Sequence, residues 1–177
     1  MSFTVSIQRQ DFDLTQEVNA LRAGDSGVGA VCCFVGTVRE FEHHREHKNN
    51  KDPQDESDPN ASQKKEALDE SIFSLELEHY AGMTESSILK IMDQARSRFG
   101  INAARVVHRI GLLQPMDQIV LVAVTASHRG ESFKACEYLM DYLKTQAPFW
   151  KKEQTTQGNA KWVDARASDE DALSRWQ

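Results

Sequence analysis

The sequence has few cysteines and prolines and no long apolar run. Only 3 of its 177 residues are cysteine and 4 are proline. No two cysteines are spaced as CxxC, which argues against a zinc or dithiol centre, and three cysteines cannot build a disulfide framework. No apolar run approaches the roughly 18 residues that cross a bilayer, and the first residues lack the pattern of a signal peptide. We therefore expect a soluble, cytoplasmic protein.

The common phosphate-binding loops are also absent. The chain contains neither GxGxxG nor GxxxxGK[ST], which excludes the usual dinucleotide and P-loop nucleotide sites. Its 27 acidic residues outnumber its 21 basic residues, giving a formal net charge of -6. A protein that coats nucleic acid needs a basic face, so this class is disfavoured. Any anion site must be a local cluster of cations.

The hydrophobic pattern predicts one domain, spanning residues 1–177, in which strands and helices alternate. Apolar residues make up 40% of the chain, enough for a core. Their spacing predicts strands at 3–7, 28–38, 71–80, 102–110 and 119–126, and helices at 13–22, 84–99 and 129–146. Thr84 is the expected cap of the second helix, and a turn at 111–118 predicts a hairpin. This order predicts an α+β fold with a mixed, mostly antiparallel sheet and packed helices.

One segment differs in composition from the rest of the chain. Between residues 42 and 66 the only hydrophobic residue is Ala61, and two prolines and many charges surround it. Such a segment cannot offset the entropy of ordering itself, so we expect a disordered loop at 42–66. Three histidines open this segment, and because we expect it to lack order we predict no metal site there.

The third predicted helix carries a lysine at the edge of its apolar stripe. Phe133, Cys136, Met140 and Leu143 form the expected stripe, and Lys144 follows directly. We therefore expect Lys144 to be partly desolvated. Removing an ammonium group from water favours the neutral amine, the form that can accept a proton.

A second lysine, Lys151, follows the proline that ends this helix. If the chain turns back after Pro148, Lys144 and Lys151 can face one cavity, and each positive charge then disfavours the other. The plainer interpretation is that both are solvated surface lysines. The residues alone leave both interpretations open.

Further cations lie at the ends of predicted strands. They are Arg39, the pair His108 and Arg109, and the pair His128 and Arg129. The planar guanidinium of arginine binds two phosphate oxygens at once, so several arginines at strand ends favour capture of a phosphate. A single arginine more often forms a surface salt bridge. Their joint occurrence in an acidic chain favours an anion site.

Several motifs together resemble the large, catalytic subunit of molybdopterin synthase. They are FVGTVR at 34–39, LEHYAGM at 77–83, HRIG at 108–111, WVDAR at 162–166 and, most specific of all, MDYLKTQAPFWKKE at 140–153. The resemblance runs from about residue 28 to residue 166 and leaves 42–66 outside it. It implies an α/β-hammerhead-like fold and an enzyme of molybdenum cofactor biosynthesis.

The resemblance also implies an activity and partners. In this family, a small ubiquitin-like subunit with a Gly-Gly C-terminus carries a thiocarboxylate. The large subunit transfers its sulfur to cyclic pyranopterin monophosphate and forms the dithiolene of molybdopterin. Two large subunits form a homodimer flanked by two small ones, which makes a heterotetramer. The reaction implies no further cofactor, no metal, no nucleic acid and no membrane.

Matched residue by residue, Lys144 and Lys151 stand at the catalytic lysines of the family. The positions that match its substrate-binding residues are Phe34, Thr37, Val38, Arg39, His108, Arg109, Met140, Lys152, Glu153 and Arg166. Of these, His108 and Arg109 would be supplied by the other copy across the dimer interface.

Two functions of other classes stay open. A non-catalytic module could bind a ubiquitin-like tail and use its cations only to clamp a carboxylate. A hydrolase of phosphorylated metabolites could use His108 or His128 as its base, but such an enzyme normally needs a metal cluster or an evident nucleophile. A test for the dithiolene product separates these possibilities.

Overall fold

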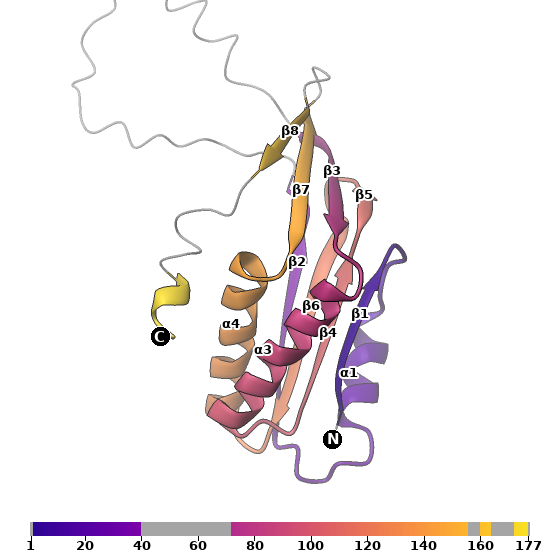
Figure 1. The fold of residues 1–177 in the computed structure, drawn as a ribbon. Helices are drawn as coiled ribbons and strands as arrows, with labels where there is room; N and C mark the ends of the chain where they lie inside the picture. The colour runs from indigo at the N-terminus through magenta and orange to yellow at the C-terminus, as the bar shows by residue number, and fades with distance from the viewer. Residues whose placement is uncertain (1, 40–71, 156–159, 164–171, 177) are drawn as a thin grey trace, which may run out of the picture.

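The computed structural model describes residues 2–39, 72–155, 160–163 and 172–176, which form two four-stranded sheets and three long helices (Figure 1). The predicted α+β class is confirmed. The predicted loop at 42–66 lies outside the described residues.

The first sheet has the order β1-β4-β6-β2. Its strands are β1 (Phe3–Gln8), β4 (Ala103–Arg109), β6 (Gln118–Ala126) and β2 (Ala30–Thr37). Strand β1 runs parallel to β4, and the other pairs are antiparallel. The predicted hairpin is confirmed because β4 and β6 are direct antiparallel neighbours.

Helices cover both faces of the first sheet. The main core lies between the sheet and two helices, α3 (Met83–Phe99) and α4 (Arg129–Thr145), which Figure 1 shows side by side. Helix α1 (Leu14–Arg22) contacts the opposite face. Alternate residues of β6 pack into the hydrophobic clusters on the two faces of the sheet, because successive side chains of a strand point to opposite faces. Val122 belongs to the α3–α4 side, and Leu121 belongs to the other side.

The second sheet contains strands that the sequence pattern did not predict. Its order is β5-β3-β7-β8, all antiparallel, with β5 (Gly111–Leu113), β3 (Ile72–His79), β7 (Phe149–Thr155) and β8 (Ala160–Val163). The prediction of one sheet was therefore incomplete, and β5 occupies part of the predicted turn. β5 and β8 are too short for a periodic signal, and the sequence of β7, FWKKEQT, does not alternate cleanly.

Thr84 was predicted to cap α3, and this prediction was wrong, because the helix begins at Met83 and its N-cap is Gly82, two residues before Thr84. The Glu85 carboxylate accepts a hydrogen bond from the backbone N–H of Gly82 at 2.7 Å, which gives this N–H group at the start of the helix a partner. Thr84 is buried, and its Oγ1 lies 3.2 Å from the carbonyl oxygen of Pro148. This contact joins the start of α3 to the connection between α4 and β7, which orients the strand that carries Lys151.

An ion pair joins α1 to the first sheet. The guanidinium of Arg105 binds the Glu17 carboxylate through two contacts, at 2.7 and 3.1 Å, and both side chains are largely shielded from solvent. We expect Glu17→Gln to lower the free energy of unfolding by about 1 kcal/mol. The substitution removes the negative charge that attracts Arg105 and replaces one of the two acceptor oxygens with an amide NH2 group.

Urea unfolding at neutral pH measures this loss. The exposed Glu78 provides a control of the same charge, and Glu78→Gln should change the free energy of unfolding by less than about 0.5 kcal/mol. Equal effects of the two substitutions would show that the ion pair contributes nothing beyond net charge.

Candidate functional site

The pairing of β7 with β3 places its two adjacent lysines on opposite faces of the second sheet. Lys151 lies opposite Leu77, and Lys152 lies opposite Glu76. Directly opposite residues of an antiparallel pair project from the same face. Leu77 is buried and Glu76 is partly exposed. Lys151 therefore projects from the inner face, which carries Leu77, and Lys152 projects from the outer face, which carries Glu76.

The inner face brings several predicted site residues together. Lys151 forms an ion pair with Glu153, whose side chain is only 12% exposed, whereas that of Lys151 is 34% exposed. Val38, just beyond the end of β2, packs in one buried cluster with Leu75 and Leu77 of β3. The chain that holds Thr37 and Arg39 is thereby brought to the same sheet as Lys151. Both of these flanking residues are exposed.

His108 lies buried at the junction of the two sheets. Its imidazole stacks on the ring of Phe149 in the same chain, with the centroids 3.8 Å apart and the planes 15° apart. Its Nδ1 lies 2.8 Å from the carbonyl oxygen of Arg109. Burial and, to a smaller extent, the nearby His79 lower the pKa of His108 from its ordinary value of 6.5 to about 4, although the hydrogen bond with the Arg109 carbonyl acts in the opposite direction. His108 is therefore neutral at pH 7 and a weak base, which argues against the hydrolase alternative for this residue.

Arg109 is held by its own chain. Its Nη1 donates a hydrogen bond to the carbonyl oxygen of Gln118 at 2.9 Å and lies 3.5 Å from the Asp11 carboxylate. These contacts fix the guanidinium at the start of β6 and partly offset its charge. Any part that Arg109 takes in a site shared with a second copy stays a prediction.

Helix α4 is rotated relative to the predicted stripe. Phe133 is 60% exposed, so its assignment to the stripe was wrong, and Lys144 is exposed where we expected partial desolvation. The buried face also includes Ala135 and Leu139, and these turn its centre away from both residues. Met140 is buried as expected, at the edge of the main core.

Two further predicted site residues, Lys152 and Phe34, lie on strands β7 and β2. On the outer face, Lys152 lies 4.0 Å from the Glu76 carboxylate, and its Nζ lies 5.7 Å from the centre of the Trp162 ring. Phe34 lies on β2 and is 40% exposed. Arg166 lies outside the described residues.

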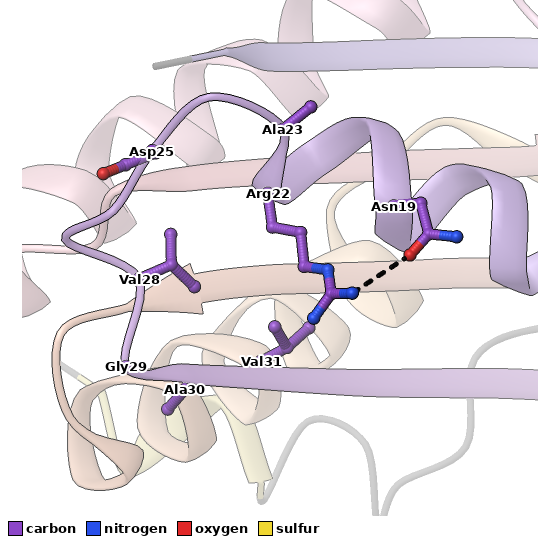
Figure 2. A pocket seen from close by; sticks show the side chains of 8 residues that line it. All are labelled: Asn19, Arg22, Ala23, Asp25, Val28, Gly29, Ala30 and Val31. Carbon is purple, nitrogen blue, oxygen red and sulfur yellow. Dashed lines mark hydrogen bonds between the residues drawn. The ribbon is translucent and has the colours of Figure 1, made fainter.

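A cavity of about 460 Å³ lies at a different place in the fold, between the end of α1 and the start of β2 (Figure 2). Its lining includes Arg22, which donates a hydrogen bond to Asn19 at 3.4 Å. It also includes Asp25, whose pKa is lowered by hydrogen bonds from the Asn102 amide and from the N–H of Gly27. None of the predicted site residues that the structure describes lines this cavity.

Residues that the sequence reasoning missed support the site from neighbouring elements. Phe149 holds His108, and His79 lies opposite Phe149 in the β3–β7 pair. The predicted strand at 71–80 already placed His79 with Leu75 and Leu77, so this signal was present. Nothing in the local pattern indicated that Phe149 begins a strand beside them.

The fold and these cations define an α+β protein whose second sheet presents Lys151 on the same face as the partly buried Phe149 and Glu153. A family model described as MoaE protein matches residues 61–146. A molybdopterin synthase catalytic subunit from Ralstonia nicotianae is 50% identical over 173 residues, which cover 98% of this chain and 84% of the relative. Another from Escherichia coli K12 is 51% identical over 167 residues, covering 94% and 93%.

A solved structure agrees with this match. Molybdopterin cofactor biosynthesis protein E from Burkholderia multivorans is 45% identical, with a TM-score of 0.73, and the match covers 99% of this chain and 97% of that one. The chain belongs to the MoaE family, and the resemblance found in the sequence motifs is confirmed.

Proposed function

We propose that this protein is the catalytic subunit of a molybdopterin synthase. It would transfer sulfur from the C-terminal thiocarboxylate of a small ubiquitin-like subunit to cyclic pyranopterin monophosphate, forming the dithiolene of molybdopterin. The observation that carries this proposal is the identity of 50% with a named catalytic subunit over 98% of the chain. The arrangement of Lys151, Glu153 and the end of β2 around one sheet face supports it.

The chemistry requires cations because both reactants are anionic. A thiocarboxylate and a cyclic phosphate must meet in one site, and positive groups offset the repulsion between them. We assign Lys144 to the thiocarboxylate, which it would hold and activate while protons move as sulfur adds to the pterin side chain. Lys151 would stabilise the developing negative charge or protonate a leaving oxygen.

The other matched residues that the structure describes differ in their exposure to solvent. Thr37, Arg39 and Phe34 are exposed and can touch a ligand directly. Val38, His108 and Met140 are buried, and we propose that they shape the site rather than contact the phosphate. Lys152 projects from the outer face, so we propose that it meets a partner chain there.

We further propose a homodimer of this chain, joined by two small subunits in a heterotetramer, at work in the cytoplasm. The word subunit in the names of the relatives supports an assembly of more than one chain. In the described part of the chain, no helix is long and apolar enough to span a membrane.

Reconstitution tests the function. We expect the purified chain, mixed with a thiocarboxylated small subunit and cyclic pyranopterin monophosphate, to form the dithiolene product, detected by mass spectrometry. A small subunit that ends in an ordinary carboxylate should bind but yield no product. Tight binding of the thiocarboxylated subunit without any product would favour the non-catalytic clamp instead.

A further inference from the structure

A second polar cluster lies on α4, one helical turn before Lys144. Its centre is Asp141, whose side chain is only 13% exposed. Oδ2 of Asp141 accepts a hydrogen bond from Nε1 of Trp176 at 2.7 Å, and Nη2 of Arg175 lies 3.2 Å from the same oxygen. The carboxylate is thus held by one neutral donor and one cationic donor, both from the segment 172–176.

Aromatic contacts fix this segment against the helices. Figure 1 shows the segment beside α4. The indole of Trp176 packs edge-on against Phe99 and Tyr138, at centroid distances of 5.9 and 5.4 Å. The guanidinium of Arg98 lies 5.6 Å from the centre of the indole ring and donates a hydrogen bond to the carbonyl oxygen of Trp176. The indole N–H is therefore held in the direction of Asp141 by its packing.

The helix places Asp141 next to Lys144. Residues three apart lie on the same side of a helix, and a carboxylate and an ammonium group at this spacing attract each other. Their attraction grows when a bound ligand excludes water. A carboxylate released at position 141 would therefore compete with an anionic ligand for the charge of Lys144.

We propose that Trp176 and Arg175 are positioning residues that commit the Asp141 carboxylate to the segment 172–176. This negative charge then does not offset the positive charge that Lys144 presents to an anionic ligand. The inference rests on the proposed function only in naming that ligand, the thiocarboxylate end of the small subunit. The contacts of Asp141 themselves are independent of the reaction.

The first test is kinetic and uses a rescue. The double variant Trp176→Phe/Arg175→Gln keeps an aromatic ring but removes both donors to Asp141. We expect the KM for the thiocarboxylated small subunit to rise at least threefold, with kcat within twofold of wild type. Adding Asp141→Asn removes the released charge and should return the KM to within twofold of wild type. A purely structural role predicts no rescue, and that result would overturn the proposal.

Asp141→Asn alone provides a conservative check, since an asparagine oxygen still accepts the hydrogen bond from Trp176. Its KM should be equal to or below that of wild type. A threefold rise in this well-folded variant would contradict the proposal.

The second test needs no turnover and separates this inference from the proposed function. Limited acetylation followed by mass spectrometry measures the reactivity of Lys144 against the exposed Lys134 of the same helix. Release of Asp141 in the double variant should slow the modification of Lys144 at least twofold relative to Lys134, and Asp141→Asn should restore it. An unchanged ratio would overturn the inference even if the dithiolene forms. A changed ratio without dithiolene would support the inference and contradict the proposed function.

Discussion

Lys144→Ala and Lys151→Ala should each lower kcat for dithiolene formation at least about 100-fold, because general acid–base groups typically contribute about 10²- to 10⁴-fold. Lys151 projects from the inner face of the second sheet, beside its ion pair with Glu153 and next to the buried cluster that includes Val38. A methyl group there can neither stabilise negative charge nor transfer a proton. Single-turnover assays with thiocarboxylated small subunit measure the rate of sulfur transfer.

Lys152 is the matched control for Lys151, since it is the next residue of the same strand and carries the same charge. It projects from the opposite face, near Glu76 and Trp162. Lys152→Ala should therefore lower kcat by less than about tenfold, with its main effect on the KM for the small subunit. If the two alanine variants lose kcat equally, the division of the sheet into two faces does not decide catalysis. Near-normal product formation by Lys144→Ala would remove that residue from the mechanism.

Acid should destabilise the protein through His108, by about 3 kcal/mol in total. The folded protein holds this imidazole in its neutral form, with a pKa of about 4, because the ring is buried against Phe149. In the unfolded chain the ring gains a proton near pH 6.5. As the pH falls from about 6.5 to about 4, the unfolded state therefore binds more protons, and stability falls by up to about 1.4 kcal/mol per pH unit. Below about pH 4 both states are protonated and this contribution stays constant.

Urea unfolding at several pH values, compared between wild type and His108→Phe, isolates the effect. Phenylalanine keeps a ring to stack on Phe149 but cannot titrate, so the variant should lack about 3 kcal/mol of the wild-type pH dependence. The carboxylates contribute equally to both proteins and cancel in the comparison. His128→Gln, at an exposed histidine, should keep the wild-type pH dependence. Parallel curves for wild type and His108→Phe would show that burial of His108 does not control acid stability.

The periodic elements could be predicted because their signals are local. Each of the three predicted helices and five predicted strands appears in the structure with bounds shifted by only a few residues. Helical spacing and strand alternation arise from the backbone repeat, so neighbouring residues are enough to reveal them. The family resemblance could also be recognised from the long motif at 140–153, since such a match depends on residue identity alone.

The motif did not reveal how its residues would be arranged. Lys151 and Lys152 are neighbours in sequence, and only the pairing of β7 with β3 assigns them to opposite faces. A shift of one residue in that register would exchange the two lysines. The same holds for Phe133, which satisfied the helical spacing but lies outside the buried face.

By itself, the amino-acid sequence determined the class of fold, the main helices and strands, and the family to which the chain belongs. Only the tertiary structure decided that the described residues form two sheets, that His108 is buried and stacked on Phe149, and that Trp176 donates a hydrogen bond to Asp141. The physical reason is the distance along the chain between the partners. Backbone periodicity and residue identity act locally, whereas strand register, burial and side-chain contacts depend on segments that meet only in the folded molecule.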